Sequence, residues 1–366
     1  MKALVLFILY AGLFEFRFAR DRLQSFTCLK ERFVPGKSSD YCTSINESLI
    51  TIFDEEHVHV LLNCSTNCEV KDTGIWVGLG KKNRTGSTWS DGTEVTFHES
   101  SVTAGEFNQT CEALDNGTWK GFNCSERKFF MCNTRDGYIV IESQKNWCQA
   151  LQFCKKNHGS LARIKSSEEN ERAKNESKGL TVWIGLVHDQ WEWRDRKCSL
   201  YREWDKINDE TSVFLKAQKP YSLDQAASSY DKCVVCSKGE VRIKVIRQES
   251  SWDEALTYCE TFHSRLLWIE DQSDQNAVSS WLNHSSFDEN APRSLWIGLR
   301  QSALFGFWIW SDRMVNWSNW EDGDIPGKSP FNHCGVIDRK NFTWRNEDCN
   351  RKLPFLCEED IAYLKN

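Results

Sequence analysis

One tetrapeptide recurs three times along the chain, as Trp76-Val77-Gly78-Leu79, Trp183-Ile184-Gly185-Leu186 and Trp296-Ile297-Gly298-Leu299. The first residues of successive copies are 107 and 113 positions apart. A repeat with this period indicates that one domain is used several times. Each copy is apolar apart from its glycine, which predicts a buried strand whose tryptophan lies in the core.

A cysteine-bearing helix is predicted upstream of the second and third copies. The stretch from Trp147 to Cys154 matches the stretch from Trp252 to Cys259: each has Trp, then Ala three residues later, an aromatic residue six later and Cys seven later. This spacing places all four side chains on one helical face and directs the cysteine into the core. The first repeat keeps only Tyr41-Cys42, with Pro35 in the tryptophan position.

A second helix is predicted between each of these helices and the tetrapeptide. Ser166-Ser167-Glu168-Glu169 has the pattern of a capping box, and stretches that begin at Asp54 and Asp271 occupy the parallel positions. Each repeat therefore predicts strand, helix, strand, helix and a buried strand, followed by a long loop and short strands that carry cysteines. The predicted fold class is α+β, pinned by disulfides.

These residues together resemble the C-type lectin-like domain, and the tandem arrangement is similar to a short, soluble relative of the mannose-receptor group. The resemblance implies three domains, each with two helices, small antiparallel sheets and a long loop. The expected boundaries are residues 1–19 for a signal peptide, 20–135 for domain 1, 136–240 for domain 2, truncated at its C-terminal end, and 241–360 for domain 3.

Composition favours an exported protein. The chain has 366 residues, 16 cysteines and a net charge of -6, so it suits an oxidising compartment and offers little to a nucleic-acid backbone. Lys2 precedes an apolar run of signal-peptide length, and no later stretch is long enough to span a bilayer. We therefore expect a secreted glycoprotein without a transmembrane segment. Ten glycosylation sequons agree with export, at Asn46, Asn63, Asn83, Asn108, Asn116, Asn123, Asn175, Asn283, Asn316 and Asn341.

The resemblance implies a disulfide framework in which the helix cysteine pairs with the last cysteine of its domain. The implied pairs are Cys259–Cys357, Cys334–Cys349, Cys42–Cys132 and Cys111–Cys124. Cys28, Cys64 and Cys68 remain in the first repeat. A Cys64–Cys68 or a Cys28–Cys64 bridge would use two of them, and sequence alone does not choose.

The second repeat departs from the family pattern. Cys233-Val234-Val235 resembles the inner cysteine strand, and the chain then runs within a few residues into the opening of repeat 3. The expected final stretch is missing, so Cys154 and Cys233 are predicted to lack their usual partners, and Cys148 and Cys198 are left to pair with each other. Two explanations stay open: a degenerate spacer domain, or an imperfect gene model. The Cys233-x2-Cys236 spacing is not read as a redox motif, because it falls on a predicted strand.

Sugar-binding members of this family hold Ca²⁺ through oxygen ligands that also contact sugar hydroxyls. Repeat 3 is the best candidate for such a Ca²⁺ site, but it lacks several of the expected ligands. Asp324-Ile325-Pro326 replaces the usual loop, and Arg345 stands where a ligand is expected. Asp324, Asn332 and Asn346 can still supply oxygens, giving a degenerate Ca²⁺ site. The wider set of candidate ligand-binding residues is Asp324, Asn332, Trp344, Asn346 and Asp348.

Other candidate sites have simpler interpretations. In repeat 1, Gly105-Glu106-Phe107-Asn108 resembles a ligand loop but stands too close to Cys111 and is better explained as a glycosylated loop. Trp317, Trp320 and Trp344 either fill the core or contact ligand.

The eight histidines are scattered, and no catalytic motif is present, so we predict that the protein is not an enzyme. It is expected to bind glycans or glycoproteins, with weak or absent Ca²⁺ dependence and no other cofactor. The alternatives are a protein-binding module, or the ectodomain of an endocytic or immune lectin receptor.

Overall fold

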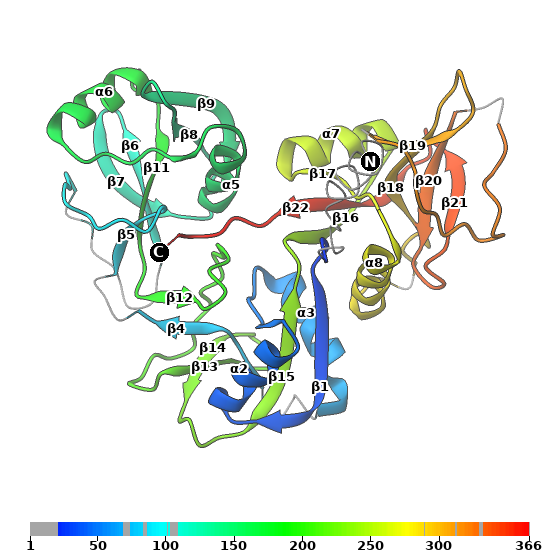
Figure 1. Cartoon of the computed structure of the whole chain (residues 1–366), viewed down its shortest axis with the longest axis horizontal. Coiled ribbons are helices and arrows are strands. Elements are labelled where there is room, and N and C mark those ends of the chain that lie inside the picture. Colours follow the sequence, from blue (N-terminus) through cyan, green and yellow to red (C-terminus); the bar gives the residue numbers. More distant parts are fainter. Residues whose placement is uncertain are drawn as a thin grey trace, which may run out of the picture.

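The computed structural model describes residues 21–68, 74–82, 86–100, 102, 109–288, 290–311, 313–328 and 332–365. The predicted signal peptide and the Gly105–Asn108 loop lie outside these residues. The chain forms three units, each around its own sheet (Figure 1). Unit 1 comprises residues 21–82 and 190–240, unit 2 residues 86–189, and unit 3 residues 241–360.

Unit 3 follows the predicted order of strand, helix, strand, helix and tetrapeptide strand. Its sheet has the order β16-β22-β18-β20-β21, with β17 beside β22 and β19 beside β18. The first and last strands of the unit, β16 and β22, are therefore antiparallel neighbours. The elements are β16 (Val241–Ser250), α7 (Trp252–Phe262), β17 (Arg265–Leu266), α8 (Gln272–His284), β18 (Ser294–Gln301), β19 (Trp308–Trp310), β20 (His333–Asp338), β21 (Trp344–Asp348) and β22 (Leu353–Asp360).

Unit 2 has the same sheet but a permuted chain order. β9 lies beside β8, which is followed across the sheet by β11, β6 and β7. The last four strands of unit 3 in sequence, β19 to β22, correspond to the first four strands here, β5 to β8. The elements are β5 (Ser87–Trp89), β6 (Thr110–Asp115), β7 (Thr118–Asn123), β8 (Lys128–Asn133), β9 (Tyr138–Lys145), α5 (Trp147–Asn157), β10 (Ser160–Leu161), α6 (Ser167–Ser177) and β11 (Val182–His188).

Unit 1 is built from two separated stretches of chain. Its sheet has the order β1-β15-β3-β13-β14, with β2 beside β15, and β4 pairs with β12 as a separate ribbon. The elements are β1 (Ser25–Phe33), α2 (Pro35–Ser44), β2 (Ser48–Leu49), α3 (Glu55–Cys64), the short 3₁₀ turn η1 (Thr66–Cys68), β3 (Ile75–Trp76), β4 (Leu79–Lys81), β12 (Trp191–Trp193), β13 (Ser212–Leu215), β14 (Leu223–Ala226) and β15 (Lys232–Lys238).

Repeats 1 and 2 therefore exchange their C-terminal halves. After β4 the chain leaves unit 1 and its next strand, β5, pairs with β11 of repeat 2. After β11 the chain returns, and β12 pairs with β4 of repeat 1. The three repeats are consecutive in sequence, but the first two are intertwined in space, with unit 2 inserted into unit 1.

A tight turn explains why the halves exchange. Asn133 at the end of repeat 1 pairs with Tyr138 at the start of repeat 2, and Thr134 N donates to Gly137 O at 2.7 Å. Gly137 has φ 137°, a conformation that glycine adopts readily. Because the first and last strands of this fold are neighbours, a hairpin joins them without strain, and it places the end of repeat 1 and the start of repeat 2 in one sheet.

The disulfides correct part of the predicted framework. Cys259–Cys357, Cys334–Cys349 and Cys111–Cys124 are present as the resemblance implies. The implied pair Cys42–Cys132 is wrong, because the exchange places these cysteines in different units. All 16 cysteines are paired, the other five bridges being Cys28–Cys64, Cys42–Cys236, Cys68–Cys233, Cys132–Cys154 and Cys148–Cys198.

The end of repeat 2 also differs from expectation. Cys233 to Cys236 lie on β15, which pairs with the first strand of unit 1 as β22 pairs with β16 in unit 3. β15 is thus the last strand of its unit and not the inner cysteine strand. The predicted loss of partners for Cys154 and Cys233 is wrong, since they bond to Cys132 and Cys68. What repeat 2 lacks is the inner cysteine pair, because β13 and β14 carry no cysteine.

The tetrapeptide tryptophans fill the cores, as predicted. Trp76, Trp183 and Trp296 are almost completely buried in their respective units. The predicted helix starts are also present: Asp54 and Asp271 cap α3 and α8. Ser166 caps α6 by accepting from Glu169 N at 3.2 Å, but Glu169 accepts from Lys165 N and so does not complete the capping box.

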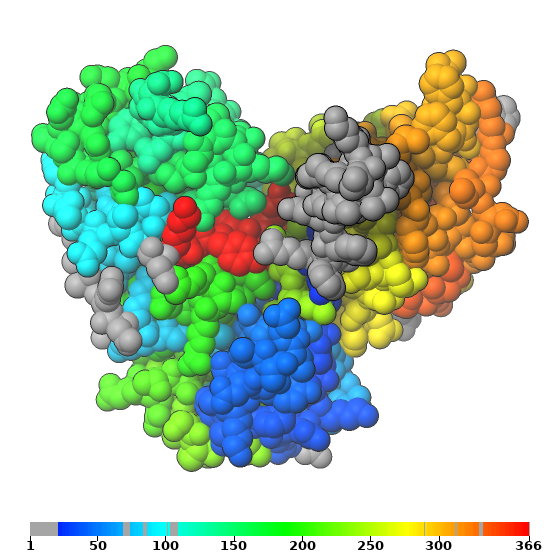
Figure 2. Space-filling model, viewed as in Figure 1, coloured from blue at the N-terminus to red at the C-terminus, as the bar shows by residue number. Residues whose placement is uncertain are grey.

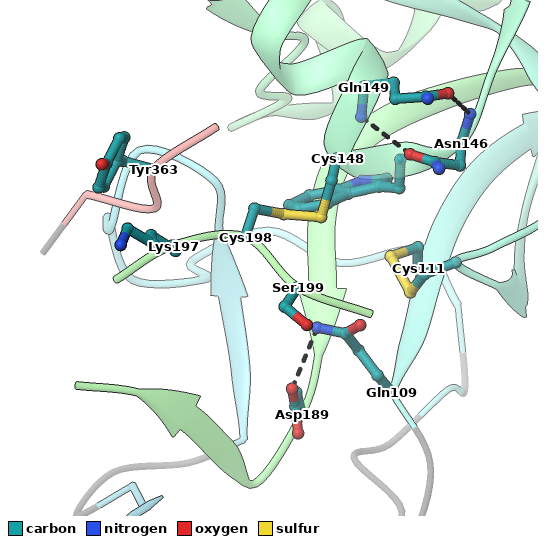
Figure 3. The surroundings of a disulfide bond; sticks show 12 residues. Gln109, Cys111, Asn146, Cys148, Gln149, Asp189, Lys197, Cys198, Ser199 and Tyr363 are labelled. Carbon is teal, nitrogen blue, oxygen red and sulfur yellow. Dashed lines mark hydrogen bonds between the residues drawn. A yellow bond between two sulfur atoms is a disulfide. The ribbon is translucent and has the colours of Figure 1, made fainter. Parts of the chain in front are cut away.

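One disulfide and the C-terminal segment tie the units together. Cys148 on α5 of unit 2 bonds to Cys198, which follows β12 in unit 1 (Figure 3). Beyond β22 the chain runs alongside the residues around Cys198. Cys198 N donates to Ala362 O at 2.7 Å, and Lys197 and Tyr363 form an isolated antiparallel β-bridge through their backbones. In Figure 1 this segment extends from unit 3 on the right toward unit 2 on the upper left. No helix within the described residues is both long and apolar enough to cross a bilayer.

A buried histidine lies where unit 1 meets unit 3. His57 on α3 contacts the rings of Phe26 and Trp281, at centroid distances of 5.2 and 5.6 Å. Neither ring nitrogen has a hydrogen-bond partner among the described residues. Burial lowers the pKa of His57 to about 3, and the positive charges of Arg242 and Lys244 contribute in the same direction. The imidazole is therefore neutral in the folded protein at physiological pH.

Acidification is expected to destabilise the protein through His57. The pKa of His57 is lower in the folded protein than in the unfolded chain, so the free energy of unfolding falls as pH drops below about 6.5. For any folded-state pKa well below 5.5, the loss at pH 5.5 is about 1.4 kcal/mol. Denaturant unfolding at pH 7.5 and 5.5 measures the change in stability of each protein, and the change from pH 7.5 to 5.5 should be less favourable in the wild type than in His57→Phe by about 1.4 kcal/mol.

The variant comparison isolates His57 from other titrating groups. Burial raises the pKa of Glu358 to about 7, which by itself makes stability fall as pH rises, equally in both proteins. His59→Phe is the matched control, because that side chain is 35% exposed. An unchanged pH dependence in His57→Phe would contradict the assignment.

Candidate ligand-binding surface

The long loop of unit 3 follows β18 and is anchored to it by side-chain hydrogen bonds. Gln301 Nε2 donates to the carbonyl oxygens of Gly306 and Gly327, both at 2.9 Å. Trp308 Nε1 donates to Pro326 O at 3.0 Å. These bonds hold the start and the end of the loop together beside β19.

The structure brings two of the candidate residues to the outer end of β20 and β21. Alternation along β21 leaves Asn346 and Asp348 exposed. The Asn346 side-chain amide lies 2.9 Å from His333 Nδ1. Asp348 accepts from the backbone and side chain of Asn350 at 3.0 and 3.1 Å. Asn346 and Asp348 thus present polar groups on one surface.

The other two oxygen donors lie at the edges of this surface. Asn332 is exposed immediately before β20, where its carbonyl oxygen accepts from Cys349 N at 3.2 Å. Asp324 is exposed on the loop. Among the described residues, neither donates to nor accepts from Asn346, so direct hydrogen bonds do not assemble a Ca²⁺ site. Ligation by Asp324, Asn332 and Asn346 stays a prediction.

Trp344 does not reach this surface. It is fully buried, its Nε1 donates to Gln275 Oε1 at 2.9 Å, and its ring packs edge-on against Trp310 and Trp317. Trp320 is also buried, and Trp317 packs against the same cluster. The candidate role of Trp344 in ligand contact is therefore not supported, because its ring has no free face.

Arg345 lies on the opposite side of β21 from Asn346. Its guanidinium is 2.9 Å from Asp338 and 3.5 Å from Glu321. Burial alone would raise the pKa of Asp338, but backbone hydrogen bonds from Lys340 and Asn341 and the nearby Arg293 keep it below its usual value. The charge of Arg345 is thus paired with an ionised carboxylate and held by the sheet.

The loop exposes apolar side chains that are not among the binding residues predicted from the sequence. Phe305 and Phe307 stack with their ring centroids 5.6 Å apart and their planes 10° apart. Figure 2 shows this part of unit 3 projecting from the molecule in orange. The run Leu304-Phe305-Gly306-Phe307 is a signal that was available in the sequence. We call the following set the apolar loop patch: Leu304 (73% exposed), Phe305 (68%), Phe307 (44%), Met314 (62%) and Ile325 (61%).

The predicted glycosylation sites are compatible with the fold. Asn83 and Asn108 lie outside the described residues. The other eight sequon asparagines are all exposed: Asn46, Asn63, Asn116, Asn123, Asn175, Asn283, Asn316 and Asn341.

Comparisons with known proteins agree with the three repeats. The family model of the lectin C-type domain matches residues 36–134, 143–238 and 248–359. The chain is 23% identical over 418 residues to the secretory phospholipase A2 receptor of Bos taurus, covering 88% of this chain and 28% of the receptor. It is 34% identical over 111 residues to C-type mannose receptor 2 of Homo sapiens, covering 30% of this chain and 7% of that receptor.

Among solved structures, human lithostathine aligns with 32% of this chain and 82% of its own, at 23% identity and a TM-score of 0.29. The chain spans less than a third of the length of either receptor.

Proposed function

We propose that this chain, which belongs to the C-type lectin domain family, is a non-catalytic extracellular recognition protein that binds its ligand through the long loop of unit 3. The apolar loop patch carries this proposal. Soluble proteins seldom expose large apolar side chains together without a binding role. Stacked aromatic rings supply the contact area that dominates binding energy at interfaces.

A protein ligand fits this surface best. The same loop exposes Leu304, Met314 and Ile325 in addition to the two phenylalanines, a composition suited to an apolar pocket on a partner. The extracellular setting is supported by the eight disulfides and by the exposed sequons. In this proposal the chain works either alone or as part of the ectodomain of a larger lectin receptor.

Glycan binding is the second candidate, and the polar surface beside the patch favours it. Asn346, Asp348 and His333 offer hydrogen-bonding groups, and the long loop of the same unit exposes aromatic rings; sugars are held by both kinds of contact. Ca²⁺ contributes weakly or not at all in this candidate, because the oxygen donors are few.

Loss of the patch is expected to weaken recognition without loss of the fold. The double variant Phe305→Ser/Phe307→Ser removes two exposed rings and should weaken ligand binding by about 30-fold, the equivalent of about 2 kcal/mol. Arrays of secreted proteins and of glycans, each probed with and without EGTA, first identify a ligand. Surface plasmon resonance then compares the wild type with the variant.

Tyr230→Ser is the matched control, since Tyr230 is a similarly exposed aromatic residue (62%) on unit 1. It should bind like the wild type. Equal binding by the patch variant and the wild type would overturn the proposal. EGTA-sensitive glycan binding that Asn346→Ala abolishes would favour the second candidate instead.

A further inference from the structure

Three side chains of unit 2 converge on one point far from the apolar loop patch. His188 Nε2 lies 2.6 Å and His98 Nε2 lies 2.8 Å from the same carboxylate oxygen, Oε1 of Glu112. One nitrogen or oxygen atom from each residue falls within 4.8 Å of the others. In the part of the chain that the structure describes, no other group of histidine, cysteine and carboxylate side chains meets this criterion.

The His–Glu–His cluster is mostly buried but is open to solvent on one side. The side chains of Glu112 and His188 are completely buried, whereas His98 is 28% exposed and leaves access from solvent. Glu112 Oε2 is buried and has no hydrogen-bond partner among the described residues. A buried carboxylate oxygen without a partner costs free energy, which a bound cation would recover.

The hydrogen bonds around the cluster fix the direction of its ligand atoms. Ser87 Oγ lies 2.8 Å from His188 Nδ1, so the other ring nitrogen, Nε2, faces Glu112. Such an outer partner orients a metal-binding imidazole. Ser100 Oγ also donates to Glu112 Oε1 at 2.7 Å and helps to fix the position of the carboxylate.

We propose that His98, Glu112 and His188 bind a zinc ion, with an outside water molecule as the fourth ligand. Two imidazoles and one carboxylate form a ligand set that suits Zn²⁺, whereas Ca²⁺ and Mg²⁺ prefer oxygen ligands only. The nitrogens would have to move apart from Glu112 by about half an ångström to accept bonds of about 2.0 Å. His98 can move with its partly exposed loop, whereas the distance to the buried His188 would widen by rotation of the Glu112 carboxylate.

The ligands come from both exchanged halves of the chain. Glu112 on β6 and His98 belong to repeat 1, whereas His188 is the last residue of β11 in repeat 2. The bound ion would therefore clamp the C-terminal half of repeat 1 onto the N-terminal half of repeat 2. Its role in this proposal is structural, and it is independent of the recognition surface on unit 3.

Metal binding by the full secreted chain tests the proposal. After treatment with a chelator, under conditions that leave the disulfides intact, the protein is titrated with ZnCl₂ against a chromophoric zinc indicator. One ion should bind per chain and raise the midpoint of thermal unfolding. His98→Ala and Glu112→Gln should each weaken binding by at least about tenfold, and Ser87→Ala by about 10- to 100-fold.

His158→Ala is the matched control, because His158 is an exposed histidine of the same unit. It should bind zinc like the wild type. Circular dichroism checks that His98→Ala is folded, which its place on a partly exposed loop favours. The proposal is overturned if the wild type shows no saturable binding, or if His98→Ala and Glu112→Gln bind with unchanged stoichiometry and affinity.

Discussion

Removal of the Cys42–Cys236 bridge is expected to destabilise the protein by about 4 kcal/mol. The bridge joins residues 194 positions apart. Because Cys68–Cys233 stays bonded, the loop that it closes in the unfolded chain has about 30 residues. In the chain-entropy model the stabilisation grows with the logarithm of loop length. Denaturant unfolding of Cys42→Ala/Cys236→Ala against the wild type measures the loss.

The short inner bridge is the matched comparison. Cys111–Cys124 spans 13 positions and closes a loop for which the same model gives about 3 kcal/mol. Peptide mapping without reduction supplies the direct test of the pairing. Peptides that join Cys42 to Cys236 and Cys132 to Cys154 are expected. A peptide that joins Cys42 to Cys132 would show that repeats 1 and 2 fold separately and would contradict the exchange.

Much of the fold could be predicted because its signals are local. The spacing from Trp252 to Cys259 defines a helical face, and α7 begins and buries its cysteine as that spacing requires. The exchange could not be predicted in this way. The sequence pattern specifies each helix and strand, but it does not specify which repeat supplies the neighbouring strand. β8 and β15 occupy the same position in two equivalent sheets, so either could pair with a given tetrapeptide strand. In the structure the turn at Gly137 joins β8 to β9 and so keeps β8 in unit 2.

The ligand surface was predictable only in part, for a related reason. Alternation along β21 exposes Asn346 and Asp348, and a period of two is visible in sequence. Trp344 follows the same alternation, yet the loop folds over it, and such coverage depends on long-range packing. The His–Glu–His cluster has no sequence signature at all, because its residues lie on a loop and two strands that only the exchange brings together.

Substitution of Trp183 by alanine is expected to destabilise unit 2 by about 3–5 kcal/mol. Trp183 is completely buried, and its Nε1 donates to Lys145 O at 3.0 Å. It lies on β11 of repeat 2, directly opposite Phe130 on β8 of repeat 1. Both residues belong to the same core cluster, so Phe130→Ala is expected to have a loss of similar size.

A double-mutant cycle turns this contact into a test of the exchange. Trp183→Ala and Phe130→Ala should be non-additive, with a coupling energy of about 0.5–3 kcal/mol, because each residue packs against the other. Phe355 is the matched control, since it occupies the equivalent position opposite Trp296 in unit 3. Trp183→Ala with Phe355→Ala should be additive to within about 0.3–0.5 kcal/mol. If Trp183 and Phe130 are equally additive, each repeat has paired its tryptophan strand with its own last strand, and units 1 and 2 are not intertwined.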